Sequence, residues 1–445
     1  MSKPYHTGTH YGTLEVGFKG WDARKTELFD ERKFSHRGGQ LMSSFLGPFV
    51  NHDYYSLQYT FGPTTDYNKI LAYLNSHPSE FTGSFDPTAN FPNDFDLSER
   101  IYAGYVMNTI SFGRLRLQGG VRIEATKDSL LGNQVTDPTG TGNLVVSPFT
   151  VDNTYTNVFP SVQAQYRFGA DTVLRAAYGM GIARPNFGDI APFLIYDPTG
   201  NASVPLSAGN PNLKPTHGQS FDILIEHYLK QVGLIQAGVF YKSLSDPIHT
   251  VTTQVTTGQY AGLNQSQPIN GPHAHVAGAE MSWQQQLKFL PGLLNGMGVR
   301  ANYSYTTSRA SFPFGFGRTD HPALNRQAPN NWNLDVTYDK KRISARMGLT
   351  HNDGYIWSYQ FQDGAPGGKQ GPLGDTYLYP HTQVDAQVSY WIPRGHGLQA
   401  IVSMLNLNNE VFGFYNGSEQ FPIQREYYSR TVSLGLRWTL SQEPQ

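Results

Sequence analysis

A two-residue alternation of apolar and polar side chains is the feature that most constrains how this chain can fold. In RLRLQGGVRIEAT, residues 114–126, leucine, valine and isoleucine occupy one parity, while arginine, glutamine and glutamate occupy the other. Successive side chains of a β-strand point to opposite faces, so this segment predicts a strand with one dry face and one wet face. The same division recurs in residues 331–338, 343–350 and 384–390. The pattern predicts an all-β fold.

About fourteen segments of this kind follow one another, and most are near the ~10 residues that a tilted strand needs to cross a bilayer. Residues 66–74 are the exception, because their spacing is helical and the segment ends before Pro78, which predicts a short helix in a loop. The predicted strands are 11–25, 98–112, 114–127, 152–168, 171–184, 217–229, 233–245, 274–288, 296–307, 329–339, 342–353, 378–392, 397–409 and 425–440.

The connections between these strands alternate strictly between short and long. The long ones are 26–97, 128–151, 185–216, 246–273, 308–328, 354–377 and 410–424. A membrane barrel has short periplasmic turns and long extracellular loops, whereas a β-sandwich or propeller has no reason to sort loop length by parity. We therefore predict an antiparallel up-and-down transmembrane β-barrel over residues 1–440, followed by a tail at 441–445.

Composition narrows the function classes. The chain has 33 Lys+Arg against 34 Asp+Glu, so it carries no cationic footprint for nucleic acid. The absence of cysteine excludes disulfide scaffolds, thiolate zinc sites and cysteine nucleophiles. No apolar run approaches the ~18 residues of a spanning helix, and MSKPYHTGTHYG has no apolar region typical of a secretory signal. Aromatic residues near strand ends, such as Tyr166, Trp391 and Trp438, fit the girdles of a membrane barrel.

Two stretches are more specific than barrel patterning. They are NVFPSVQAQYRFGADTVLRAAYGMGIARPNFGDIAP, residues 157–192, and GNPNLKPTHGQSFDILIEHY, residues 209–228. Together with the last strand, at 427–440, they resemble the barrel of TonB-dependent outer-membrane receptors. The resemblance spans about residues 97 to 440. It implies energised uptake of a scarce bulky solute, such as a siderophore, cobalamin or an oligosaccharide, with outer-membrane lipid and lipopolysaccharide, a plug domain and the TonB complex as partners.

The sequence also departs from that family. Members have a signal, a short box that engages TonB and a plug filling a barrel of ~22 strands, whereas about fourteen strands are predicted here. We therefore expect the C-terminal part of a receptor that cannot couple to TonB by itself. We further expect the first strand to pair with the last, which would close a ring with an empty lumen.

Charged and amide residues on the polar parity, and in the Arg-Pro and Asn-Pro loops, are the candidate site. We interpret them as lining the lumen and contacting the solute. The alternatives are that the lumen charges pair across strands to keep the wall rigid and that the loop residues serve turn geometry. The candidates are Arg116, Arg122, Glu124, Arg175, Arg184, Asn186, Asn210, Asp222, Glu226, Arg346 and Asp385.

Neither catalysis nor a bound cofactor is predicted. His273 and His275, with His52 and Asp53, could chelate a metal, but paired loop histidines without a nearby carboxylate are typical of solvated residues. No nucleophile elbow, triad spacing or phosphate loop is present. Two other function classes stay open: a passive porin and an outer-membrane enzyme.

Overall fold

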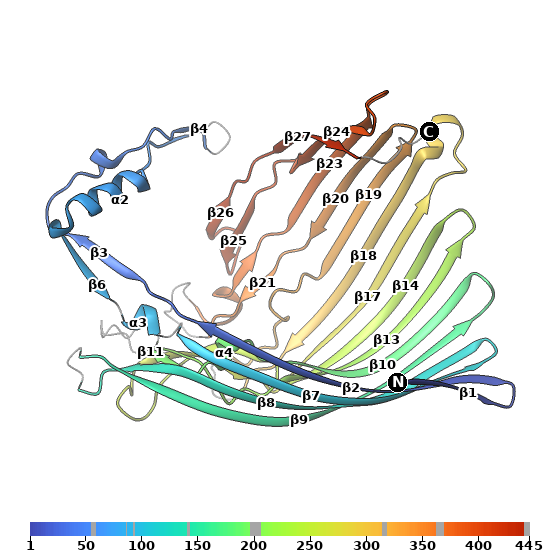
Figure 1. Ribbon diagram of the computed structural model, residues 1–445, viewed down its shortest axis with the longest axis horizontal. Coiled ribbons are helices and arrows are strands. Elements are labelled where there is room, and N and C mark those ends of the chain that lie inside the picture. Colours follow the sequence, from blue (N-terminus) through green and yellow to red (C-terminus); the bar gives the residue numbers. More distant parts are fainter. Residues whose placement is uncertain are drawn as a thin grey trace.

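One curved antiparallel sheet dominates the fold (Figure 1). The computed structural model describes residues 1–54, 59–85, 87–91, 94–139, 143–195, 206–313, 318–361 and 369–439. The principal strands follow each other in chain order, and each is hydrogen-bonded to the next. They are β1 (Ser2–Thr7), β2 (His10–Glu27), β7 (Phe95–Phe112), β8 (Leu115–Thr136), β9 (Val145–Arg167), β10 (Thr172–Ala183), β13 (Thr216–Leu229), β14 (Gly233–Ser245), β17 (His273–Gln286), β18 (Met297–Ala310), β19 (Asn330–Lys340), β20 (Ile343–Asn352), β23 (His381–Trp391), β24 (Leu398–Leu405) and β27 (Thr431–Trp438).

Every predicted strand overlaps one of these strands, so the fold class is confirmed. Strand β1 is additional, and it forms a hairpin with the first third of β2. Several strands continue beyond the predicted ends, most of all β8 and β9, which stay paired from Leu115↔Tyr166 to Thr136↔Val145. The meander therefore extends well past the segments that alternate most clearly.

The two faces of the sheet differ as the alternation predicts. In β13, Phe221, Ile223 and Ile225 are 49%, 54% and 45% exposed on one face, while Asp222 and Glu226 occupy the other parity. The last strand behaves in the same way, since Leu434 and Leu436 are exposed rather than packed in a core. Apolar side chains exposed over a whole sheet face mark a surface made for an apolar environment.

The registers place all the long connections at one rim of the sheet. Glu27 pairs with Phe95 and Ala183 pairs with Thr216, so the segments 28–94 and 184–215 leave the sheet at the same end. Lys340, whose Nζ donates to the carbonyl of Gly292, lies at the opposite end with the tight turns. The long connections and the tight turns therefore lie at opposite ends of the described sheet. We refer to these ends as the loop rim and the turn rim.

The buried apolar core lies at the loop rim. It consists of Phe95, Leu97, Leu130, Ile190, Ala191 and Leu213. The short helix α4 (Phe187–Ile190) supplies Ile190 directly after the Arg-Pro loop, and it packs on the inward side of β7 and β8. This core fixes the position of the loop that carries Arg184 and Asn186.

Short elements decorate the loop rim. The predicted loop helix is α2 (Tyr67–Ser76), and Asp66 caps it by accepting from the amides of Asn68 and Lys69. No helix in the described ranges is long and apolar enough to cross a bilayer. The others at this rim are β3 (Arg32–His36), η1 (Met42–Phe45), β4 (Asn51–Asp53), β5 (Tyr59–Phe61), η2 (Pro78–Glu80), β6 (Phe81–Phe85), α3 (Pro87–Asn90), β11 (Leu194–Ile195), β12 (Leu206–Ala208), β15 (Ile248–Gln254), β16 (Asn264–Asn270), β21 (Tyr355–Ser358), η5 (Gly371–Leu373), β22 (Thr376–Leu378), β25 (Phe412–Asn416) and β26 (Pro422–Glu426). The short helix η4 (Gly292–Gly296) lies instead at the turn rim, between β17 and β18.

The expected closure between the first and last strands is wrong for the described residues. Strand β27 pairs with β24 alone, and no register joins residues 11–25 to residues 425–440. Figure 1 shows β2 and β27 at opposite sides of the curved sheet. One physical reason is that β1 folds back onto the free edge of β2, from Thr7↔His10 to Ser2↔Glu15. A second is that strand number, tilt and stagger are linked, so a small ring needs a sheet geometry different from that of a wide barrel.

Candidate functional site

A hollow of ≈ 600 Å³ lies at the loop rim, where four long connections meet. We call it the rim pocket. Arg184 and Asn186 of the predicted Arg-Pro loop contribute to it, together with residues of the connections 246–273, 308–328 and 354–377. Its lining residues are Ala183, Arg184, Pro185, Asn186, Asp189, Thr216, Ile248, His249, Thr250, Asn325, Arg326, Trp357, Ser358 and Tyr359.

Arg326 and Trp357 form the most distinctive contact in the rim pocket. The Arg326 guanidinium lies 4.4 Å from the centre of the Trp357 ring, which is cation–π geometry. The backbone of Arg326 has a φ of 58°, which is uncommon for any residue other than glycine. Its amide donates to the carbonyl of Ile356 at 2.7 Å. Arg326 is exposed and has no carboxylate partner among the described residues. The pocket therefore presents a free cation supported by an aromatic ring.

His249 and Tyr359 form the buried side of the rim pocket. His249 is 6% exposed, and its Nε2 has no hydrogen-bond partner in the described part of the chain. Burial lowers the pKa of His249 to about 4, so the ring is neutral at neutral pH. The Tyr359 hydroxyl accepts from the amide of Asn325 and donates to the carbonyl of Ala323, both at 2.8 Å. These contacts tie the connection 308–328 to the connection 354–377 directly after β21.

A charged cluster on the inner wall lies next to the rim pocket. The Arg184 Nη2 donates to Glu124 at 2.7 Å and to the Thr126 hydroxyl at 3.1 Å, and its Nε lies 3.5 Å from Glu99. Arg122 donates to the other Glu124 oxygen at 2.7 Å. Three predicted residues, Arg122, Glu124 and Arg184, therefore meet in one network. Their pairing supports the interpretation that lumen charges pair across strands to keep the wall rigid.

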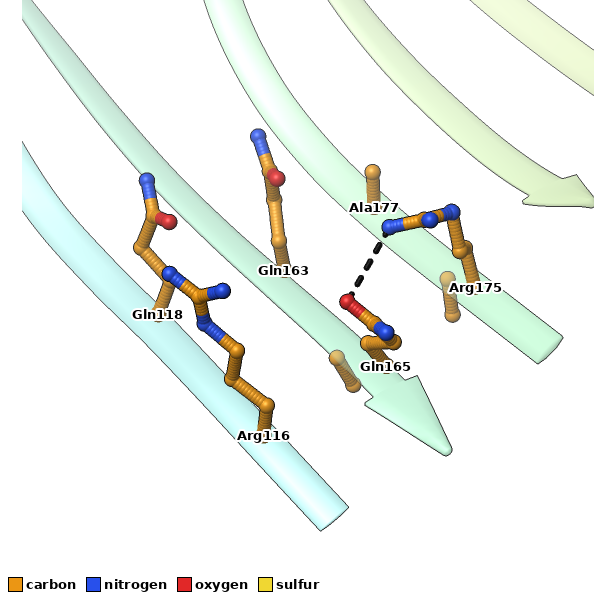
Figure 2. A pocket seen from close by; sticks show the side chains of 8 residues that line it. Arg116, Gln118, Gln163, Gln165, Arg175 and Ala177 are labelled. Atoms are coloured by element: carbon orange, nitrogen blue, oxygen red, sulfur yellow. Dashed lines mark hydrogen bonds between the residues drawn. The ribbon is translucent and has the colours of Figure 1, made fainter. Parts of the chain in front are cut away.

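A second hollow, of ≈ 270 Å³, lies on the inner wall near the turn rim. Figure 2 shows the predicted residues Arg116 and Arg175 beside Gln118, Gln163 and Gln165, on three adjacent strands. We call it the wall hollow. Arg175 donates to Glu226 through Nε at 3.1 Å and through Nη2 at 3.2 Å. Glu226, a further predicted residue, is therefore the ion-pair partner of Arg175.

The remaining candidates lie apart from both hollows. Asn210 holds the loop rather than facing a pocket, because its Nδ2 donates to the carbonyl of Pro268 at 3.0 Å. Asp385 accepts from Gln383 and from the amide of Asn406 at 2.9 Å. Arg346 approaches Asp335 only at 4.0 Å, and Asp222 is exposed without an ion pair in the described ranges. The sequence pattern placed them on the wet face but did not bring them to one site.

Sequence reasoning missed a buried ion pair behind the rim pocket. The side chains of Arg318 and Asp375 are both 0% exposed and bond to each other at 2.5 and 3.0 Å. They come from different long connections, 57 residues apart, so no local pattern links them. The same holds for Arg326, whose role depends on Trp357 from another connection.

The histidines weighed as metal ligands are dispersed. His273 contacts the Ser311 hydroxyl at 3.2 Å, and His275 stacks near Tyr241 with 6.4 Å between ring centres. Within the described ranges, no three His, Asp or Glu side chains are grouped as a metal site.

A family model described as TonB dependent receptor-like, beta-barrel, matches residues 5–409. The chain belongs to this family. TonB-dependent receptors also account for the fold, since the described meander of long strands with all long connections at one rim is the wall of such a barrel. A search of curated proteins found no significant match.

Solved receptor structures share this fold. The ferric-catecholate import receptor Fiu from E. coli K12, in its closed form, superposes with a TM-score of 0.60 at 16% identity, covering 98% of this chain and 53% of that chain. The ferric citrate transporter FecA in its unliganded form gives 0.59 at 12% identity, with 98% and 52% coverage. The siderophore receptor PiuA from Acinetobacter baumannii gives 0.59 at 12% identity, with 98% and 54% coverage. The chain therefore spans about half the length of these receptors.

Proposed function

We propose that this chain is the wall of an outer-membrane receptor that binds a bulky anionic chelate of the siderophore class, and that the solute docks in the rim pocket. The observation that carries the proposal is the exposed Arg326 guanidinium supported by the Trp357 ring. A guanidinium on an aromatic face offers both charge and a flat apolar surface, which suits planar, oxygen-rich anions.

The Arg326 guanidinium of the rim pocket favours an anion over a neutral solute. Arg184 is already paired with Glu124 and Glu99, and the Asp189 carboxylate, which keeps its charge, accepts a hydrogen bond from the Asn186 amide at 3.1 Å. Arg326 is left as the lining cation without a described partner. A negatively charged chelate gains this interaction, whereas cobalamin or an oligosaccharide would use mainly the aromatic rings and the amides.

The names of the similar solved structures support the same class of solute. They are receptors or transporters of ferric catecholates, ferric citrate and siderophores. We propose a location in the bacterial outer membrane, with the exposed apolar face against lipid and the loop rim beside lipopolysaccharide. Energised uptake would belong to the whole receptor, with a plug domain and the TonB complex as partners.

The experiment is a binding titration of the protein in detergent with ferric citrate and with a ferric tris-catecholate, followed by quenching of tryptophan fluorescence. We expect at least one chelate to bind. Arg326→Ala should weaken that binding by about tenfold, because the loss of one charge-assisted contact of about 1.4 kcal/mol changes Kd by that factor. Arg309→Ala is the matched control, because Arg309 lies at the same rim on β18 but does not line the pocket.

Two results would contradict the proposal. The first is equal loss of binding in Arg326→Ala and Arg309→Ala, which would indicate a diffuse charge effect. The second is binding of a neutral oligosaccharide or cobalamin, with no binding of either ferric chelate, in a protein whose heat-modifiable migration shows that it is folded.

A further inference from the structure

The wall hollow has an excess of hydrogen-bond donors. Its polar lining consists of Arg116, Gln118, Gln163, Gln165 and Arg175, and no carboxylate is among its lining residues. In Figure 2 these side chains rise from the same face of neighbouring strands and surround one space. An arginine offers five N–H donors and no acceptor, so two of them leave the hollow rich in donors.

Arg175 orients the neighbouring glutamine. Its Nη1 donates to the Gln165 Oε1 at 3.1 Å, the contact drawn as a dashed line in Figure 2. Because a guanidinium can only donate, the carboxamide oxygen must face Arg175 and the NH₂ group must face away. That NH₂ group has no hydrogen-bond partner among the described residues, whereas Glu226 holds the other side of Arg175. Gln165 is therefore a positioned donor.

Arg116 is the free charge of the wall hollow. It lies opposite Gln165 in the β8–β9 register, and Gln165 lies opposite Arg175 in the β9–β10 register. The Arg116 side chain is exposed and has no ion pair or hydrogen bond in the described part of the chain. Two cations thus flank one glutamine, and a carboxylate compensates only Arg175.

The other carboxylates that the registers place on this face near the wall hollow are too far away to neutralise Arg116. Asp222 lies opposite Ala177 on β13, three strands away from β8, and Glu15 of β2 lies two strands away, level with Gly120 and thus four residues along β8 from Arg116. Three strand spacings of about 4.8 Å are roughly 14 Å, and two spacings combined with four residues of about 3.3 Å are roughly 16 Å, so both separations exceed the Debye length of about 8–10 Å in physiological salt. The field of Arg116 is therefore uncompensated at the hollow.

We propose that the wall hollow is an oxyanion site, in which Arg116 and the Gln165 NH₂ group bind the oxygens of a carboxylate or phosphate group on a small molecule. The hollow of ≈ 270 Å³ accommodates such a group with a few further atoms. The site goes beyond the rim pocket, because it lies at the opposite rim: Arg116 directly follows the tight turn that joins β7 to β8. A solute passing along the inner wall from the loop rim would meet this site last.

The test is calorimetric titration of the full chain in detergent with inorganic phosphate and, separately, with citrate. We expect at least one of these probes to bind, and Arg116→Gln to weaken that binding by tenfold or more. Gln165→Glu should weaken it by a similar factor, because the new carboxylate would occupy the guanidinium groups. Stronger binding of citrate would identify a carboxylate ligand, and stronger binding of phosphate a phosphate ligand.

The matched control is Arg300→Gln. Arg300 is an exposed arginine on β18, near the same rim, and it is absent from the lining of the hollow. We expect its change to alter affinity less than twofold. The wall hollow is judged by the response of phosphate binding to Arg116→Gln, and the rim pocket by the response of ferric chelate binding to Arg326→Ala, so failure of the rim pocket and failure of the wall hollow are distinguishable.

Two outcomes would overturn the proposal. One is that neither probe binds to wild-type protein shown to be folded by heat-modifiable migration. The other is that Arg116→Gln and Arg300→Gln lose binding to the same extent, which would reduce the effect to general surface charge.

Discussion

Arg318 and Asp375 form a two-point ion pair in which both side chains are fully buried. Nη1 lies 2.5 Å from Oδ1 and Nη2 lies 3.0 Å from Oδ2, and Asp320 accepts a second pair of bonds from the same guanidinium. Burial acts to lower the pKa of Arg318, but the two carboxylates outweigh it and raise the pKa. The two side chains therefore form an ion pair that joins the connections 308–328 and 354–377 behind the rim pocket.

Removing one partner of this pair should loosen the rim. Asp375→Asn leaves the Arg318 charge buried with a weaker partner, and breaking a buried pair costs about 3–5 kcal/mol. We expect faster amide exchange across β21 and β22, the strands next to the pair, measured by hydrogen–deuterium exchange. Asp320→Asn is the control: its side chain is 35% exposed, so the expected cost is about 1 kcal/mol. Equal exchange in the two variants would contradict the role given to burial.

His249 should make the rim sensitive to acid. Its folded-state pKa is about 4, below the ordinary value of 6.5, because burial disfavours the charged ring. As the pH falls below about 6.5, His249 binds a proton in the unfolded segment before it does so in the folded one. The folded segment therefore has its full stability above about pH 6.5 and loses stability progressively down to about pH 4. The difference between the two pKa values corresponds to about 3 kcal/mol.

The measurement is hydrogen exchange of β15 at pH 7 and pH 4, corrected for the intrinsic pH dependence of exchange. His249→Gln should remove the pH-dependent part of the opening free energy, because glutamine does not titrate. His321→Gln, a change at an exposed histidine on the connection 308–328, should leave that part unchanged. A pH dependence that survives in His249→Gln would assign it to another group.

The alternation of side chains was sufficient to predict the sheet. Each face of a strand such as β13 meets a single environment, so apolar Ile223 and charged Asp222 indicate which face each residue occupies. Strand β1 was missed because SKPYHT, residues 2–7, has no such division. The edge position of β1 also explains the failed closure, because edge pairing depends on backbone geometry and not on side-chain pattern.

The candidate sites were less predictable than the sheet. Arg116 and Arg175 could be placed on the wet face from parity alone, and Arg184 could be found through the Arg-Pro motif. Arg326 and Arg318 could not be found in this way. Their partners, Trp357 and Asp375, lie on another connection, and the path of a long loop is fixed by tertiary contacts that leave no periodic trace in the sequence.

A single charge should distinguish the two faces of the sheet. Ile223→Arg places a guanidinium at the middle of β13 on the apolar face, where a lipid environment costs about 2–4 kcal/mol. Asp222→Arg, one residue away on the wet face, should cost less than about 1 kcal/mol. The measurement is the free energy of unfolding from lipid vesicles in guanidinium chloride. Similar costs for the two variants would contradict the assignment of the apolar face to lipid.

Engineered disulfides should report which strands are neighbours, because the chain has no cysteine of its own. Ser403 and Ser433 are register partners on β24 and β27, and Thr13 and Thr109 are partners on β2 and β7. Directly opposed residues in an antiparallel pair lie about 4.5–5.5 Å apart at Cα, within the range that a disulfide bridges. Cysteines at either pair should therefore cross-link within one chain under mild oxidation.

Cysteine at Ser433 combined with cysteine at Thr13, Gly17 or Trp21 of β2 should give no cross-link within one chain, because β27 and β2 are not joined by a register. Migration on a non-reducing gel separates cross-links within a chain from those between chains by mass. A bond within one chain from Ser433→Cys to any of the three positions would show that the sheet closes into a ring. Cross-links between chains would instead show that the free edge of β27 pairs with a second copy, as unpaired strand edges tend to do.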